Sequence, residues 1–300
     1  LNQNASELFA FIRIDIEKFQ LVNSFFGVQE GDNLLRYVAR DIQAFAGEST
    51  RISYGRIEAD IFCICMPYQG EQMMVELTRY IRMRFAQYPL EYDIVPTIGI
   101  YIVEDRNLPV DSMYDRANLA AKQCKGNYIH NYAFYTADMS EEIEKEQRIV
   151  NNMKSALEGN EFILYLQPKY DLQDNSMDGA EVLVRWKSPS RGMVSPGEFI
   201  PIFERNGFII KLDYYVWEKT CQLLAKWIEE GRNPEPVSVN ISRVHFARTD
   251  LAEHISSLVD EYNVPHHLIE LELTESAFFD DKALLLETIK KLKEFGFEIS

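Results

Sequence analysis

The second half of the chain alternates strand-like segments with helix-like segments, and this rhythm strongly limits the folds open to it. Strands that alternate with helices usually lie parallel in one sheet, because the helix carries the chain back to the start of the next strand. The predicted strands lie near 162–170, 179–186, 236–241 and 268–274. The predicted helices lie near 197–206, 212–230, 250–262 and 281–295. The pattern therefore predicts an α/β unit built on a parallel sheet.

Three of these predicted strands have one polar and one apolar face, since residues two apart in a strand share a face. The polar faces hold Glu181, Leu183 and Arg185, then Ser238, Asn240 and Ser242, then Glu270, Glu272 and Thr274. For any single strand, water on the polar side is an equally good explanation. Because the helices must cover the apolar faces, however, we expect the polar faces to point into a barrel or crevice.

Glu181, Asn240 and Glu272 converge at this predicted interior. Neighbouring carboxylates repel unless a cation lies between them, and an all-oxygen ligand set suits Mg²⁺ or Mn²⁺ better than zinc. In a parallel α/β barrel the active site lies at the carboxyl ends of the strands, where these residues fall. Arg185 is suited to bind a phosphate bidentately. A metal beside such an arginine indicates phosphodiester hydrolysis.

Composition excludes several classes of protein. With 300 residues, 46% of them hydrophobic, and no apolar run of 18 residues, the chain is neither a disulfide-stapled miniprotein nor disordered nor membrane-spanning. A net charge of −16 argues against binding a nucleic acid polymer. The four cysteines match no zinc or redox spacing, so we expect free thiols and cytoplasmic domains.

The first half has a different rhythm, typical of an α+β domain. Strands are predicted at 8–15, 51–57, 61–66, 95–103 and 132–136, and helices at about 30–46, 71–87 and 112–124. The strands at 51–57 and 61–66 are expected to form a β-hairpin. We therefore divide the chain into a first domain at 1–137, a connecting helix at 138–160 and a second domain at 161–300.

Five blocks of the second domain resemble, in order, the EAL domain of cyclic di-GMP phosphodiesterases. They are Q-P at 167–168, E-V-L-V-R-W at 181–186, S-P-G-E-F-I-P at 195–201, V-N-I-S at 239–242 and E-L-E-L-T-E-S at 270–276. The signature itself departs from the family at Val182, where alanine is usual. Any one block alone would be weak, but five in register are specific.

This resemblance implies an α/β TIM-like barrel that linearises cyclic di-GMP to pGpG and pairs as a homodimer through the EAL domain. It assigns Mg²⁺ or Mn²⁺ to Glu181, Asn240 and Glu272, and substrate contacts to Gln167, Leu183 and Arg185. It also assigns Glu275 to the support of a catalytic loop, although a helix N-cap or a surface acid is the alternative for that residue.

By the same resemblance, the family's next block falls just past Ser300, so 161–300 is expected to be the first part of an EAL domain. The later catalytic residues would then be absent, and these 300 residues alone are expected to be inactive. The first domain is expected to lack its N-terminal part. Segments outside the sequence could anchor the whole protein to a membrane.

The first domain resembles the GGDEF domain of diguanylate cyclases, a nucleotide-cyclase-like fold with a ferredoxin-like core. The match rests on D-I-E-K-F-Q at 15–20 with Asn23, on G-D-N-L-L at 31–35, and on A-K and G-N at 121–122 and 126–127. At the signature hairpin, however, E-A-D-I-F at 58–62 replaces G-G-D-E-F. The lost glycines remove the close backbone approach to a nucleotide, so cyclase activity is not expected.

Four residues of the nucleotide site survive. The resemblance makes Asp15 and Asp60 metal ligands, and Asn23 and Asp32 guanine-binding residues. Two readings stay open: GTP binding as an allosteric signal, or a purely structural domain. For the whole protein we expect cyclic di-GMP signalling, with a metal-dependent phosphodiesterase as the main hypothesis and a non-catalytic cyclic di-GMP receptor as the alternative.

Overall fold

The computed structural model describes residues 7–47, 49–127, 130–273 and 282–300. The chain divides into two compact units, 1–144 and 145–300, each with its own hydrophobic core. Within the described ranges, none of the helices is both long and apolar enough to cross a bilayer. All four cysteines are free thiols, as predicted.

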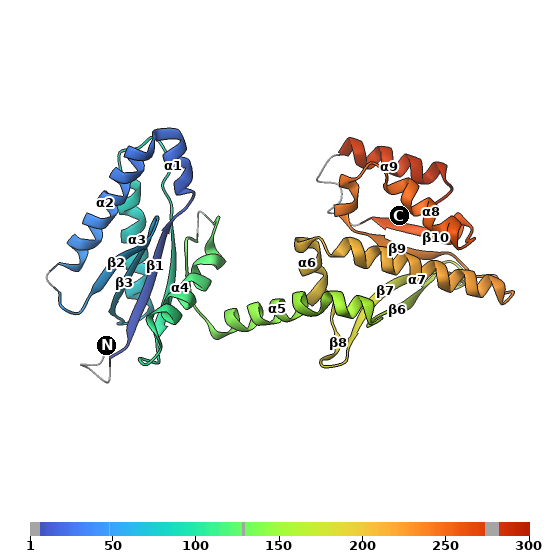
Figure 1. The fold of residues 1–300 in the computed structure, drawn as a ribbon, viewed down its shortest axis with the longest axis horizontal. Helices are drawn as coiled ribbons and strands as arrows, with labels where there is room; N and C mark the ends of the chain where they lie inside the picture. The colour runs from blue at the N-terminus through green and yellow to red at the C-terminus, as the bar shows by residue number, and fades with distance from the viewer. Residues whose placement is uncertain (1–6, 48, 128–129, 274–281) are drawn as a thin grey trace. The chain divides into compact units, whose positions relative to one another are not determined.

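The first unit is built on a five-stranded sheet in the order β2-β3-β1-β4-β5 (Figure 1). Its strands are β1 (Phe9–Ile16), β2 (Ser53–Glu58), β3 (Ile61–Pro67), β4 (Pro96–Val103) and β5 (Tyr132–Phe134). Its helices are α1 (Phe19–Phe26), α2 (Val28–Ala46), α3 (Glu71–Ala86) and α4 (Val110–Cys124). Strand β1 is central and runs antiparallel to β3 and β4, while β4 and β5 are parallel. The predicted hairpin of β2 and β3 is present.

Alternation along β1 explains how helices cover both faces of this sheet. Ala10, Ile12 and Ile14 are buried in a core shared with α2 and α3. Phe11, from the other face, packs in a second cluster with residues of α4. Helix α4 lies so close to the sheet that a Cβ on Gly99 would come within 1.8 Å of a backbone oxygen of α4, so glycine is required there.

The second unit contains a six-stranded sheet in which β11-β10-β9-β7-β6 are successive neighbours and β8 pairs with β7. Its strands are β6 (Phe162–Tyr170), β7 (Met177–Ser188), β8 (Gly192–Val194), β9 (Val237–Ile241), β10 (Ile269–Leu273) and β11 (Glu298–Ile299). The helices of this part are α5 (Ala137–Glu158), α6 (Pro196–Asn206), α7 (Ile209–Glu229), α8 (Leu251–Glu261) and α9 (Lys282–Glu294). Strands β7, β9 and β10 are parallel, as predicted, and β11 adds a further parallel strand beside β10.

The direction of β6 corrects one prediction, because β6 runs antiparallel to β7 rather than parallel to it. Parallel neighbours need a crossover of about a dozen residues or more. Only residues 171–176 separate the two strands, and they form a turn in which the amide of Asp171 donates to the carbonyl oxygen of Ser176. Helix α1 and the short strand β8 were not predicted at all.

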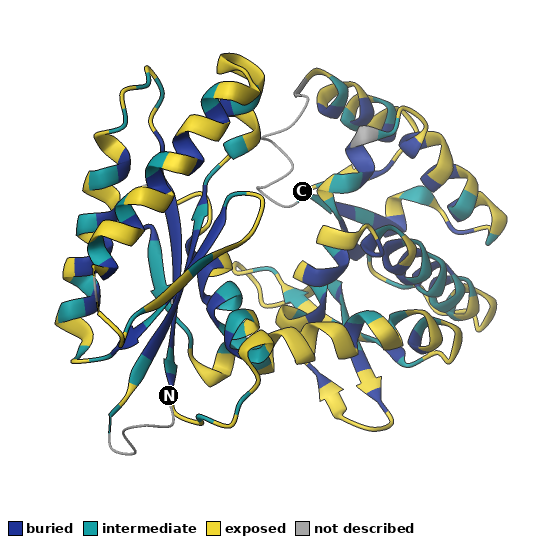
Figure 2. Ribbon diagram, turned by 60° about the vertical axis from the view of Figure 1, so that its left-hand side comes forward, coloured by how far each residue is buried: buried dark blue, intermediate teal, exposed yellow. Residues whose placement is uncertain are grey.

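The apolar strand faces of the second unit receive its helices, as the sequence indicated. Val182, Val239 and Leu271 are buried among residues of α6, α7 and α8. Figure 2 shows buried residues concentrated on the strands and on the helix sides that meet them. Helix α5 contributes Ile149 and Ala156 to this core, so its second part belongs to the second unit. The predicted fold classes, an α+β domain followed by part of an α/β TIM-like barrel, are confirmed.

Candidate functional site

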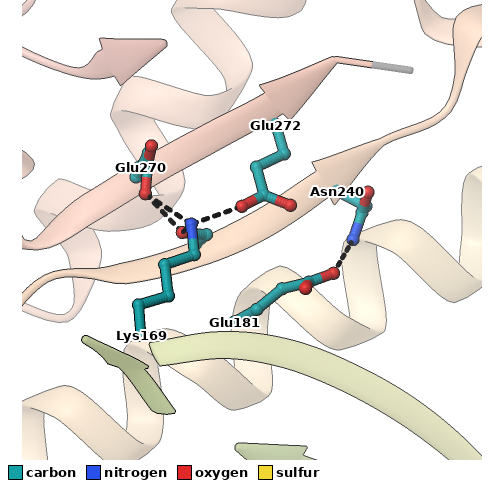
Figure 3. A network of polar contacts seen from close by, with 6 residues as sticks. Lys169, Glu181, Asn240, Glu270 and Glu272 are labelled. Carbon is teal, nitrogen blue, oxygen red and sulfur yellow. Dashed lines mark hydrogen bonds and ion pairs between the residues drawn. The ribbon is translucent and has the colours of Figure 1, made fainter. Parts of the chain in front are cut away.

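Strand register brings Glu181, Asn240 and Glu272 to one region of the second sheet. Asn240 on β9 lies opposite Glu272 on β10, and Glu181 on β7 lies opposite Ser238 on β9. The side-chain amide of Asn240 donates to Glu181 Oε1 at 3.2 Å (Figure 3). The three residues predicted to form one site thus share the polar face of three neighbouring strands. Glu181 and Asn240 are 59 positions apart along the chain, and Asn240 and Glu272 are 32 positions apart.

Lys169 is the residue of this region that the sequence analysis missed. Its ammonium group donates to Glu272 Oε1 at 2.5 Å and to Glu270 Oε2 at 3.0 Å, and it also contacts the hydroxyl of Ser238 (Figure 3). The Ser238 hydroxyl donates in turn to Glu270. The signal was available, because Lys169 lies two residues after Gln167 and therefore on the same strand face.

The charges of this network support one another. Burial alone would lower the pKa of Lys169, but the hydrogen bonds and charges of Glu272 and Glu270 outweigh burial and raise that pKa. Burial alone would raise the pKa of Glu270, yet hydrogen bonds from Ser238 and Lys169 bring it below its ordinary value. The ammonium and the Glu270 carboxylate therefore both stay charged at neutral pH.

The donor set fits a hard divalent cation. In the described part of the chain, no three His, Cys, Asp or Glu residues form a metal-binding group, so the candidate set is two carboxylates and one amide. Asn240 occupies one oxygen of Glu181, and Lys169 occupies one oxygen of Glu272. The second oxygen of each carboxylate and the amide oxygen of Asn240 remain for a cation. Mg²⁺ commonly binds through one or two carboxylates and completes its shell with water or phosphate oxygens.

The three expected substrate-contact residues share this face. Gln167 on β6 lies directly opposite Glu181, and Leu183 lies opposite Tyr165. Arg185 donates to the carbonyl oxygen of Val184 at 3.0 Å, and its guanidinium carbon lies 6.0 Å from the centre of the Tyr165 ring. Arg185 is thus nearer the carboxyl end of β7 than Glu181. Glu275 lies outside the described residues.

A second polar site lies in the first unit. Asp15, near the end of β1, and Asp60, in the turn between β2 and β3, line one pocket of about 450 Å³ together with Lys18, Gln20 and Lys125. Burial and, next, the neighbouring Asp15 raise the pKa of Asp60 to about 6. Asp15 also forms an ion pair with the buried Arg13 at 3.1 Å. Because two adjacent carboxylates repel each other, a cation bound between them would offset the part of this shift that Asp15 causes.

Asn23 and Asp32 are not among the described residues that line this pocket. The side-chain oxygen of Asn23 is buried beside Gly31 without a hydrogen-bond partner among the described residues. A Cβ on Gly31 would lie 1.9 Å from that oxygen, so a larger residue there would require the Asn23 side chain to move. Asp32 is exposed and pairs with Arg36 at 3.9 Å. The structure therefore brings Asp15 and Asp60 together in one pocket, and Asn23 and Asp32 are not part of its lining.

The altered signature hairpin keeps a glycine-like backbone. Ala59 has φ of 41°, a left-handed conformation that favours glycine. Arg56 stabilises the turn by donating to the carbonyl oxygen of Ala59 at 2.6 Å. Alanine at this position thus adopts a backbone conformation that glycine would adopt at lower cost.

Comparison with known families agrees with both resemblances. The EAL domain family model matches residues 150–300, and the family model of the diguanylate cyclase GGDEF domain matches residues 1–128. The chain is 27% identical over 297 residues to the bifunctional diguanylate cyclase/cyclic di-GMP phosphodiesterase MucR of Pseudomonas aeruginosa, covering 97% of this chain and 43% of that protein. It is 25% identical over 292 residues to the cyclic di-GMP phosphodiesterase PdeR of Escherichia coli, covering 96% of this chain and 44% of that protein.

Among solved structures, a MucR phosphodiesterase in complex with c-di-GMP matches with a TM-score of 0.48 and 28% identity, over 51% of this chain and 62% of that one. The c-di-GMP-bound S helix-GGDEF-EAL structure of LapD from Vibrio cholerae matches with a TM-score of 0.47 and 17% identity, over 97% of this chain and 68% of that one. The chain spans less than half the length of the two curated relatives above.

Proposed function

The chain belongs to the EAL domain family, with a GGDEF domain before the EAL domain, and we propose that the whole protein hydrolyses cyclic di-GMP to pGpG with Mg²⁺ or Mn²⁺. The observation that carries this proposal is the convergence of Glu181, Asn240 and Glu272 on the polar face of three neighbouring strands. Each carboxylate keeps an oxygen available for a cation while its other oxygen is held by a neighbour.

In this proposal Glu181, Asn240 and Glu272 hold the metal ion. The bound ion would lower the pKa of a water molecule and stabilise charge on the phosphate. Arg185 would bind the phosphodiester, since a guanidinium matches two phosphate oxygens. Gln167 and Leu183 would contact the rest of the nucleotide, and Glu275 would support a loop beside the site. Lys169 would orient Glu272 by donating to its Oε1.

The test is an assay in which the whole protein is incubated with cyclic di-GMP and Mg²⁺ or Mn²⁺. Chromatography then detects the product. The wild type should form pGpG, and Glu181→Ala should form none. Glu229→Ala is the matched control, because Glu229 is an exposed acid at the end of α7. Loss of activity in both variants would contradict the assigned site.

A non-catalytic receptor is the alternative, and the same preparation distinguishes it. Tight binding of cyclic di-GMP without product would identify a receptor, and the proposed hydrolysis would then be wrong. The homodimer implied by the family resemblance stays a prediction. Light scattering of the whole protein with and without cyclic di-GMP would test it.

For the first domain we propose a regulatory role in which GTP binds without being cyclised. The supporting observation is the pocket with Asp15 and Asp60, where the raised pKa of Asp60 favours a bound cation such as the Mg²⁺ of a nucleotide. Calorimetric titration with MgGTP should give binding that Asp15→Asn weakens at least tenfold. If about millimolar MgGTP gives no heat of binding, the proposed GTP binding is wrong and the first domain has a purely structural role.

A further inference from the structure

Asn240 lies in the part of β9 that pairs with β10 but no longer pairs with β7. Strand β7 pairs with β9 only at Ala180–Val237 and Glu181–Ser238. Among the described residues, the part of β9 beyond Ser238 has a ladder partner only on β10, where the described pairing ends at Ile241–Leu273. A strand end without a neighbour leaves backbone groups unpaired, and such groups need other partners when they are buried.

Helix α7 supplies those partners from outside the sheet. The indole of Trp217 donates to the carbonyl oxygen of Asn240 at 3.1 Å. One turn earlier on the helix, Asp213 Oδ2 accepts from the backbone amide of Ser242 at 3.2 Å. The two side chains thus hold the backbone at Asn240 itself and two residues after it. Both are buried or nearly so, which keeps water from competing for these bonds.

We call Trp217 and Asp213, with their hydrogen bonds to the backbone at Asn240 and Ser242, the clamp. His245 holds this clamp in place. Its ring is fully buried, and Nε2 lies 3.0 Å from the same Asp213 oxygen that accepts from Ser242. The ring also packs against Trp217, with ring centres 4.9 Å apart, and against Tyr214 at 5.5 Å. The turn after β9 is therefore bound to α7 by hydrogen bonds and by aromatic packing.

We propose that Trp217 and Asp213 are positioning residues that fix the side chain of Asn240 for metal binding. This inference rests on the proposed metal site of the second domain. The Asn240 amide reaches Glu181 at 3.2 Å, close to the longest useful hydrogen-bond distance, so a small shift of the end of β9 would separate them. The clamp acts on the backbone of Asn240, whereas Lys169 acts on the carboxylate of Glu272.

Trp217→Phe tests the clamp, because it removes the donor N–H and keeps an aromatic ring against His245. Trp227→Phe is the matched control, since Trp227 lies on the same helix and lines a pocket with Pro234 and Val237, at the other end of β9. Two quantities are measured on the whole protein: Mn²⁺ affinity by titration, and hydrogen–deuterium exchange of residues 237–247 without metal.

Trp217→Phe should weaken Mn²⁺ binding about fivefold and speed exchange in 237–247 by a similar factor, the usual effect of one lost hydrogen bond. Asp213→Asn should act in the same direction, and Trp227→Phe should match the wild type in both measurements. Unchanged Mn²⁺ affinity in a folded Trp217→Phe protein would overturn the inference, as would an equal loss in Trp227→Phe.

Failure of the inference differs from failure of the proposed function. If the wild type binds no Mn²⁺, the proposed metal-dependent function is wrong, and the inferred role of the clamp in metal binding falls with it. If the wild type binds Mn²⁺ and both clamp variants bind it equally well, only the inference is wrong. The metal-free exchange data show in either case that the Trp217→Phe protein was folded when it was measured.

Discussion

The raised pKa of Asp60 predicts an unusual pH dependence of stability for the first unit. A carboxyl whose pKa is higher in the folded state than in the unfolded chain favours folding when it is protonated. Its contribution is therefore fully present below the unfolded pKa, and it is lost as the pH rises through about 6. Asp60→Asn removes the charge and should abolish this loss.

The magnitude follows from the two pKa values. The difference between 3.8 and about 6, at about 1.4 kcal/mol per tenfold change in proton affinity, sets an upper limit of about 3 kcal/mol. Solvent screening at a partly exposed turn reduces this to about 1–2 kcal/mol. Asp60→Asn should thus be more stable than the wild type by about 1–2 kcal/mol at pH 7 and about equal to it near pH 4.

The assay is urea denaturation of residues 1–144, followed by circular dichroism between pH 4 and pH 8. Circular dichroism is needed because all three tryptophans, Trp186, Trp217 and Trp227, lie in the second unit. Asp93→Asn, at an exposed position, is the control, and its free energy of unfolding should change with pH as that of the wild type does. If Asp60→Asn also runs parallel to the wild type from pH 4 to pH 8, the proposed burial and repulsion at Asp60 are wrong.

Three further predictions concern single residues. Ala59→Gly should stabilise the first unit by about 1 kcal/mol, because glycine adopts a φ of 41° without steric cost, and a thermal melt lower than that of the wild type would contradict this. Lys169→Met should destabilise the second unit by about 2 kcal/mol, since Glu270 and Glu272 lose their shared partner. Urea unfolding followed by tryptophan fluorescence measures this, with Lys187→Met at an exposed position as the control. Equal destabilisation by both substitutions would refute the role of the Lys169 ion pairs. The lowered pKa of Glu270 contributes stability that is present above its unfolded pKa of about 4.5 and is lost as the pH falls through the folded pKa. Glu270→Gln should therefore reduce the loss of unfolding free energy at acidic pH. An unchanged loss at acidic pH would contradict this role of Glu270.

The polar strand face of the second unit was predictable because two simple regularities agree there. Period-two alternation assigns Glu181, Asn240 and Glu272 to polar faces, and the intervening helices decide which way those faces point. Neither regularity depends on long-range detail. The same alternation also puts Lys169 beside Gln167, so its face could have been assigned.

What the sequence could not supply was the partner of each side chain. Lys169 reaches Glu272 across 103 positions, and that contact depends on β6 running antiparallel to β7, which a strand-and-helix rhythm does not reveal. The clamp of Trp217 on Asn240 likewise depends on where β7 leaves β9. In the first unit, motif order suggested one nucleotide site, whereas Asn23 and Asp32 lie outside the pocket that Asp15 and Asp60 line.

The reversed first strand of the second unit also decides at which end of β7 the chain enters the sheet after α5. A strand parallel to β7 would receive the chain from α5 at the amino edge of the sheet, opposite the polar residues. Because β6 is reversed, its first residue, Phe162, lies beside Trp186 near the carboxyl end of β7. Glu161, at this entry, accepts from the indole of Trp186 and from the amide of Lys187, both at 2.8 Å. The segment that follows α5 is therefore tied to the sheet beside Arg185, because Phe162 pairs with Trp186, the residue next to Arg185.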